Sequence, residues 1–207
     1  MKLSSNSFDD NAAIPGEYAF AVPNAQSRYT LSTNRNPHLA WAEVPEHAQS
    51  FVLICQDPDV PSVGDDVNQE GKSIAASLPR VDFYHWLLID IPASQREINE
   101  GSHSSGITPQ GKNGPQAADG QRHGLNDYTA WFASDPQMSG DYYGYDGPCP
   151  PWNDERLHRY VFTVYALDVP CLEIQGPLQG ANILDALQGH VLAKASLTGT
   201  YTLNMNL

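Results

Sequence analysis

Five stretches of the chain are rich in β-branched and aromatic residues and are separated by Gly and Pro. They are Glu17–Val22, Ser50–Gln56, Phe83–Ile91, His158–Asp168 and Ala195–Leu203. β-branched and aromatic side chains favour strands, and Gly and Pro commonly end them. The pattern predicts a mainly β fold of antiparallel sheets packed together, with a few short flanking helices.

Two of the predicted strands differ in how their apolar residues are spaced. His158–Asp168 carries apolar residues at both alternate sets of positions, which indicates a strand covered on both faces inside a sheet. Ala195–Leu203 instead alternates apolar residues with Ser and Thr, so we expect one of its faces to meet solvent. One helix is predicted, with Asn182 as its N-cap, because five apolar side chains beyond that residue share a helical face: Ile183, Leu184, Leu187, Val191 and Leu192.

The chain length of 207 residues is typical of one domain, and a hydrophobic fraction of 41% is enough for a sizeable core. We expect a single domain over residues 1–207, with its core at about residues 17–205 and a flexible tail over residues 1–13. The N-terminus has no apolar stretch of the kind found in secretory signals, and no apolar run is long enough to span a membrane. These observations predict a cytoplasmic protein.

The charge balance argues against polyanionic partners. The chain has 24 acidic and 11 basic side chains, for a formal net charge of −13, and no cluster of Lys or Arg. Such a surface repels nucleic acids and anionic lipid headgroups, so we expect no nucleic-acid partner and no stable membrane association. The cysteines Cys55, Cys149 and Cys171 have neither zinc-site nor paired spacing, so we expect free thiols and no cofactor.

Polar residues of the kinds that bind ligands or take part in catalysis lie in or near the ends of the predicted strands. Asp57 and Asp59 follow the strand Ser50–Gln56, and Pro58 and Pro61 predict a turn there. Such a turn could cap backbone N–H groups or present a carboxylate to a cleft. His85 lies inside a strand, where a histidine is more often a core residue, and His158 opens another.

If these histidines and a carboxylate meet, two chemistries fit them. One is a metal site for iron or zinc. The other is an anion pocket in which imidazoles donate to phosphate oxygens.

Several motifs occur together in one order along the chain. They are Asn36–Pro37 with Leu39–Trp41, Ser50–Ile54, Asp57–Pro61, His85–Pro92, Gly147–Pro151, His158–Asp168 and Gly189–Ala193. In this order the chain resembles the phosphatidylethanolamine-binding protein family, in its bacterial and archaeal YbhB/YbcL branch, the Raf-kinase-inhibitor-like group. The resemblance runs from about residue 18 to residue 201.

This resemblance implies an anion pocket at one end of the sheets. Carried over residue by residue, it assigns the pocket to Asp57, His85 and His158, its wall to Gly147, Pro148 and Tyr160, and the turn below Asp57 to Asp59 and Pro61. It further implies a non-catalytic protein that binds a phosphate-bearing small molecule or a phosphorylated residue and modulates a protein kinase or protease, with a homodimer as one possible assembly. The alternative is a metal-dependent or His/Asp acid-base hydrolase that uses the same pocket.

Two segments depart from the family pattern. Ser62–Arg80 is long, which predicts an altered pocket rim, and Trp152–Leu157 is bulky, so Trp152 could cover part of the entrance. Arg159 points away from the adjacent His158 along a strand, so we expect it to form a structural ion pair. Because the histidines would lose protons near their reference pKa of about 6.5, anion binding is expected to weaken above about pH 7.

Overall fold

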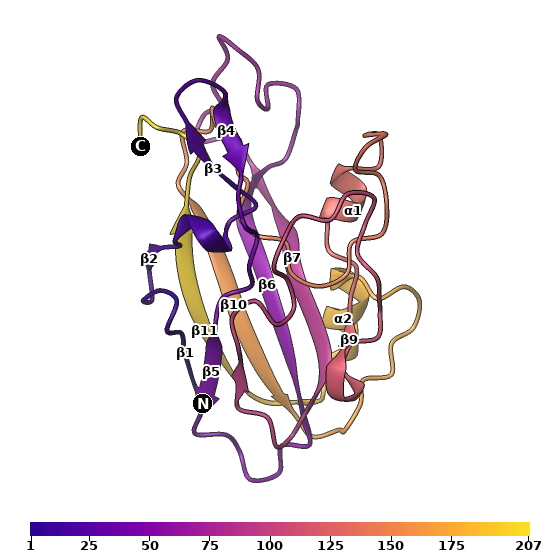
Figure 1. The fold of residues 1–207 in the computed structure, drawn as a ribbon. Coiled ribbons are helices and arrows are strands. Elements are labelled where there is room, and N and C mark those ends of the chain that lie inside the picture. Colours follow the sequence, from indigo (N-terminus) through magenta and orange to yellow (C-terminus); the bar gives the residue numbers. More distant parts are fainter.

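The computed structural model describes residues 1–207, and Figure 1 shows its arrangement. The strands are β1 (Lys2–Ser4), β2 (Ala12–Ala13), β3 (Ala21–Asn24), β4 (Arg28–Leu31), β5 (Leu39–Ala42), β6 (Ser50–Pro61), β7 (Arg80–Pro92), β8 (Glu97–Ile98), β9 (Arg122–His123), β10 (His158–Leu167) and β11 (Val191–Tyr201). The helices are η1 (Gly16–Tyr18), η2 (Ala118–Gly120), α1 (Tyr128–Trp131) and α2 (Gly180–Ala186). None of these helices is long and apolar enough to cross a bilayer.

The strands form three sheets. The main sheet has six strands in the order β2-β11-β10-β6-β7-β9, and all its pairs are antiparallel except β11 with β2. The small sheet has the order β1-β5-β8, and β3 and β4 form a separate hairpin. The predicted mainly β class, with antiparallel sheets and few short helices, is confirmed.

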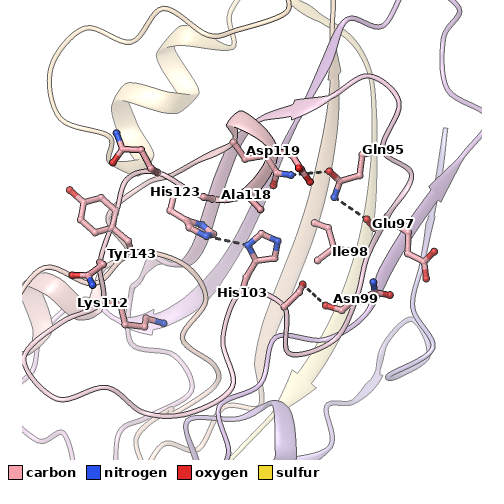
Figure 2. A pocket seen from close by; sticks show the side chains of 15 residues that line it. Gln95, Glu97, Ile98, Asn99, His103, Lys112, Ala118, Asp119, His123 and Tyr143 are labelled. Atoms are coloured by element: carbon pink, nitrogen blue, oxygen red, sulfur yellow. Dashed lines mark hydrogen bonds between the residues drawn. The ribbon is translucent and has the colours of Figure 1, made fainter.

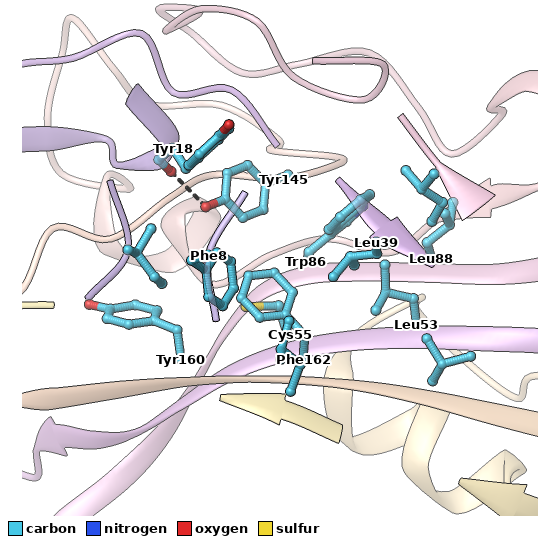
Figure 3. Packing of buried hydrophobic residues seen from close by; sticks show 14 of the residues in the cluster. Phe8, Tyr18, Leu39, Leu53, Cys55, Trp86, Leu88, Tyr145, Tyr160 and Phe162 are labelled. Carbon is cyan, nitrogen blue, oxygen red and sulfur yellow. Dashed lines mark hydrogen bonds between the residues drawn. The ribbon is translucent and has the colours of Figure 1, made fainter. Parts of the chain in front are cut away.

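The larger hydrophobic core lies on the face of the main sheet that the small sheet covers. Figure 3 shows Leu53, Trp86 and Phe162, from three neighbouring strands, packed together with Leu39 of β5. The next residues along the strands, including Val52 and Leu87, point to the opposite face and pack against α2 in a second core. Because both faces of β6 and β7 are covered, the middle of the main sheet is rigidly held and can position side chains at its ends.

Two predicted strands behave as their patterns indicate. β10 lies inside the main sheet between β11 and β6. In β11, Leu197, Gly199 and Tyr201 are buried, and the intervening Thr198 and Thr200 are only half-buried. The alternating pattern of β11 therefore correctly indicates one buried face and one face that is more exposed to solvent.

Three local predictions are wrong. The first predicted strand, Glu17–Val22, is split between the short helix η1 and the start of β3. The predicted late helix starts after Gln179 rather than at Asn182, and it ends at Ala186, because Val191 and Leu192 belong to β11. The predicted turn at Asp57–Pro61 is part of β6, where a shift of the pairing register with β7 between Asp57 and Val60 accommodates Pro58.

Residues 1–13, expected to form a flexible tail, are paired into the fold. β1 pairs antiparallel with β5, and β2 pairs parallel with β11. Between them, Phe8 lies in the larger core and contacts Phe162 with ring centroids 5.8 Å apart. Gly199 permits this packing, because a Cβ there would collide with the Ile14 side chain. The burial of Phe8 and Ile14 explains why a polar-looking N-terminus is ordered.

Candidate functional site

A cavity of about 850 Å³, here called the strand-end cavity, lies at the end of the main sheet nearest α1 and the β3–β4 hairpin (Figure 1). Five of the residues predicted from the sequence line it: Asp57, Pro61, His85, His158 and Tyr160. Most of the other lining residues are apolar, and they include the aromatic side chains of Phe20, Phe83, Tyr128 and Phe132. The cavity therefore combines a small polar group with a large apolar wall.

The register of the main sheet brings these residues together. β6 and β7 pair Asp57 with Phe83, and β6 and β10 pair Gln56 with Val161. In this antiparallel register the end of β6, the first half of β7 and the start of β10 lie at one end of the sheet. Asp57, His85 and His158 are each at most 3% exposed, so they meet at the floor of the cavity rather than at its rim.

Three predicted site residues do not line the cavity. Asp59 is buried behind it, facing two arginines. Gly147 lies against the backbone of Tyr18 and Ala19, where a Cβ would collide, and its N–H donates to Asn34 Oδ1 at 2.8 Å. Pro148 accepts a hydrogen bond from the Phe20 N–H at 2.9 Å. This part of the loop anchors the wall, and the next residues, Cys149, Pro150 and Pro151, form the wall itself.

His158 is held between two carboxylates. Its Nδ1 donates to Asp57 at 2.7 Å and its Nε2 donates to Asp154 at 3.1 Å. Burial alone would lower the pKa of His158, but the hydrogen bonds and charges of Asp154 and Asp57 outweigh it and raise that pKa to about 9. His158 is therefore a cation at neutral pH, and neither ring nitrogen is free to bind a ligand or a metal ion.

Arginines surround the carboxylates behind the cavity. Arg80 contacts both oxygens of Asp154, at 2.5 and 3.0 Å. Asp59 accepts hydrogen bonds from Arg156 and from the guanidinium of Arg159, the latter at 2.8 and 3.0 Å. Burial would raise the pKa of Asp59, but Arg159 and Arg156 lower it below its usual value. The ion pair predicted for Arg159 is confirmed.

His85 is in a different state from His158. Its Nδ1 lies 2.7 Å from the carbonyl oxygen of Asp146, which can only accept, so Nδ1 carries the proton. Burial lowers the pKa of His85, although Asp57 and Asp146 oppose that shift, so the ring is neutral at neutral pH. Its Nε2 then has a lone pair and no protein partner. The expectation that both imidazoles donate to an anion does not fit this geometry, because only His85 has a ring nitrogen available.

Two further groups of the cavity carry polar hydrogens. The hydroxyl of Tyr160 is buried and has no hydrogen-bond partner, and burial raises its pKa well above the usual value, so it stays a donor. Burial raises the pKa of the Cys149 thiol to about 12. Cys149 is therefore a protonated thiol in the wall and not a thiolate nucleophile.

The sequence reasoning missed two buried acids. Asp154 holds Nε2 of His158, and its position four residues before His158 was the available signal. Asp146 accepts from Asn34, Asn126 and Lys112, each at 2.8 Å, while its carbonyl fixes the His85 ring. No sequence signal identifies Asp146, because its partners come from distant parts of the chain.

The two segments that depart from the family pattern differ in their effect. From Ser62–Arg80, the residues Gly64, Val67 and Asn68 line the strand-end cavity, so this segment does shape the rim. Trp152 does not line it; its ring lies under Arg28, 4.8 Å from the guanidinium carbon. Asn153 ties the two segments together, since its side chain donates to the carbonyl of Asp66 at 2.8 Å.

The side chains that could ligate a metal ion are not arranged for it. No group of three or more His, Cys, Asp or Glu side chains converges on a common point.

Comparison with known proteins places this geometry in a family context. The family model described as phosphatidylethanolamine-binding protein matches residues 4–202. A UPF0098 protein of Methanothermobacter thermautotrophicus is 33% identical to this chain, and the alignment covers 97% of this chain and 98% of the relative. The UPF0098 protein YbhB of Escherichia coli is 29% identical, and the alignment covers 98% of this chain and 100% of YbhB. Among solved structures, E. coli YbcL matches with a TM-score of 0.69 at 23% identity, covering 97% of both chains. A phosphatidylethanolamine-binding protein homologue from Chlamydia trachomatis matches with a TM-score of 0.61 at 28% identity, over 97% of this chain and 95% of its own.

Proposed function

This chain belongs to the phosphatidylethanolamine-binding protein family, and we propose on that basis that it is a non-catalytic binding protein whose strand-end cavity accepts a small phosphate-bearing ligand. The observation that carries the proposal is the buried hydroxyl of Tyr160, which lines the cavity and has no hydrogen-bond partner. Beside it, His85 also lines the cavity and uses only its Nδ1 in a hydrogen bond within the protein. Buried polar groups in proteins are nearly always hydrogen-bonded. A bound ligand with oxygen atoms would supply the missing partners.

The ion-paired groups behind the cavity, taken by themselves, favour an anion. Three carboxylates there face four cationic groups: Asp57, Asp59 and Asp154 against His158, Arg80, Arg156 and Arg159. These groups carry one positive charge in excess, while Asp135 in the cavity lining adds one negative charge and the whole chain carries −13. His158, Arg80 and the three carboxylates are buried, so their charges are screened less than distant surface charges, whereas the side chains of Arg156 and Arg159 are 37% and 55% exposed.

The neutral His85 sets a condition on binding. Its Nε2 lone pair would repel a phosphate oxygen unless one proton lies between them. That proton comes either from the ligand, whose second pKa is about 6, or from protonation of His85. Tyr160 donates to a second oxygen without any change of charge. The complex therefore holds one proton more than the separated partners at alkaline pH.

The cavity chemistry favours binding over hydrolysis. Both nitrogens of His158 are occupied, and Cys149 is a protonated thiol. No observation favours the alternative hydrolase, which would need a nucleophile or a metal-bound water.

The apolar mouth supports a protein partner for this ligand. Leu31 and Trp131 line the cavity and are 58% and 53% exposed. We propose that the cavity binds a phosphorylated residue of a partner protein, such as a protein kinase or protease. By this binding the protein would modulate the activity of that partner in the cytoplasm. The three cysteines, which form no disulfide, are compatible with a reducing compartment.

Thermal unfolding with phosphoethanolamine or inorganic phosphate tests the binding proposal. At 100 times its dissociation constant a ligand adds about 2.7 kcal/mol, which raises the unfolding midpoint of a domain this size by about 5–10 °C. His85→Ala should abolish that rise, and His190→Ala, a change at a half-exposed histidine outside the cavity, should keep it. An equal rise in both variants, or no rise in the wild type with either anion, contradicts the proposal.

A further inference from the structure

A second cavity, of about 390 Å³, lies between the loops around β8 and η2 and shares no lining residue with the strand-end cavity. We call it the histidine-pair cavity, because Figure 2 shows His103 and His123 in contact at its centre. Its wall is rich in side-chain amides: Gln95, Asn99, Asn113, Gln116 and Gln121. Ser102 adds a hydroxyl and Tyr143 a half-buried aromatic ring.

The two imidazoles carry no charge at neutral pH. Nδ1 of His103 and Nε2 of His123 are 3.2 Å apart, a hydrogen bond that needs a single proton between them. Burial lowers the pKa of His103 to about 4 and, together with the charges of His103 and Lys112, that of His123 to about 3. The floor of the cavity is therefore a neutral pair.

A neutral pair of this kind has one further donor nitrogen and one further acceptor nitrogen besides the hydrogen bond between the rings. The two rings share two protons, and one of them lies in the hydrogen bond between the rings. The other must then be on either Nε2 of His103 or Nδ1 of His123, and the remaining nitrogen of these two has a lone pair. Nδ1 of His123 is buried and has no partner, and the residue is only 7% exposed.

Gln121 adds a second unpartnered atom to the same wall. Its Nε2 donates to Gln95 Oε1 at 2.9 Å, and Gln95 donates in turn to the carbonyl of Glu97 at 3.0 Å. That chain leaves Oε1 of Gln121 as a buried acceptor without a donor, on a residue that is 3% exposed. Buried polar atoms normally have hydrogen-bond partners, so two such atoms without partners in one cavity indicate a polar ligand-binding site.

The charges around the cavity disfavour an anion. The ammonium of Lys112 is already engaged by the carboxylate of Asp146 and the carbonyl oxygen of Tyr145. The other charged lining residues are Glu97 and Asp119, which are both acidic. A phosphate or carboxylate would meet acceptors and negative charge here, with no free cationic group to offset them.

We infer that the histidine-pair cavity binds a small neutral polyhydroxylated molecule of the monosaccharide class. A hydroxyl group both donates and accepts, so adjacent hydroxyls satisfy the donor and acceptor of the imidazole pair, and a third donates to Oε1 of Gln121. The amides of the wall have the same dual character, and the ring of Tyr143 offers an apolar face. The volume lies within the usual range for small-molecule sites.

The test is a titration of the protein with glucose, N-acetylglucosamine and inositol. The readout is the NMR signals of the Gln121 side-chain amide and of the His103 and His123 rings. At least one of these probes should shift those signals at millimolar concentration. Gln121→Leu, which removes the acceptor at similar volume, should weaken the affinity about tenfold, as expected for one buried hydrogen bond. Gln175→Leu is the matched control, because Gln175 is exposed and outside both cavities, and it should leave the affinity unchanged.

Three results would overturn the inference. The first is the absence of shifts with every probe in the folded wild type, and the second is binding that Gln121→Leu leaves intact. The third is a response to small amines or phosphate but not to polyols, which would assign the site to another chemistry. His85→Ala separates this inference from the proposed function, since it should abolish phosphate binding in the strand-end cavity and leave polyol binding unchanged.

Discussion

Two histidines at one end of the main sheet have opposite roles because their hydrogen-bond partners differ. His158 meets two carboxylates and is held as a cation, whereas His85 meets a carbonyl oxygen and is neutral. The first supplies fixed positive charge, and the second presents a lone pair to the cavity. The residue type alone predicts neither state, because the partner decides which form of an imidazole is stable.

The Tyr160 hydroxyl gives a prediction that separates binding from stability. Because the hydroxyl is buried without a partner, Tyr160→Phe should leave the free protein equally or more stable, while the phosphate affinity falls about tenfold. Denaturant unfolding and calorimetric titration measure the two effects on the same sample. Tyr165→Phe, on the opposite face of β10, is the control and should keep the affinity. A Tyr160→Phe protein with wild-type affinity would remove this hydroxyl from the site.

The sequence identifies the polar floor of the strand-end cavity only in part. Asp57, His85 and His158 follow from the family resemblance and from their places near strand ends. Asp154 and Asp146, which fix the two imidazoles, could not be assigned in this way, since the pairing of Asp146 with Lys112 and Asn34 depends on how loops fold together. Side-chain pairing across long sequence separations requires three-dimensional structure.

At the level of elements, the sequence pattern works best where a strand lies inside the main sheet. β10 and β11 show the predicted burial, because their neighbours on both sides are strands. It fails at Val191 and Leu192, whose spacing suits a helix but whose hydrogen-bond partner is β10. It also fails at Asp57–Pro61, since the irregular pairing of β6 with β7 tolerates prolines that a regular ladder excludes.

The docking of the N-terminal segment on β11 gives a prediction at this scale. Gly199→Ala places a methyl group against Ile14, with Phe8 just beyond it, and should destabilise the fold by about 1–3 kcal/mol, the usual cost of overpacking. Gly106→Ala is the matched control, because a Cβ there meets no atom within 4 Å. Urea denaturation measures both variants. Equal stabilities for the two would mean that residues 1–14 pack more loosely than described.

For the whole molecule, buried histidines predict how stability depends on pH. The folded-state pKa of His158 is about 9, above its unfolded value of 6.5, so its contribution is complete below pH 6.5 and is lost as the pH rises through 9. The folded-state pKa values of His103 and His123 are about 4 and 3, so their contribution is present above pH 6.5 and is lost as the pH falls through those values. The free energy of unfolding should therefore be greatest near pH 6.5.

Urea unfolding across the pH range measures this profile. The alkaline loss due to His158 should be about 3 kcal/mol, from a shift of between two and three pKa units. His158→Gln should be less stable near neutrality and should lack that alkaline decline. A wild-type stability that stays level from neutral pH to about pH 9.5 would contradict the charged state assigned to His158.

The central claim is that the strand-end cavity binds a phosphate-bearing anion through Tyr160 and one proton shared with His85. The most direct measurement is calorimetric titration with phosphoethanolamine from about pH 5.5 to pH 8.5 on wild type and His85→Ala. Above about pH 6.5, where neither the phosphate nor His85 retains the shared proton, the wild-type affinity should fall by up to about tenfold per pH unit. His85→Ala should abolish or strongly weaken binding at every pH. An affinity that does not change with pH, or one that His85→Ala leaves intact, would contradict the account.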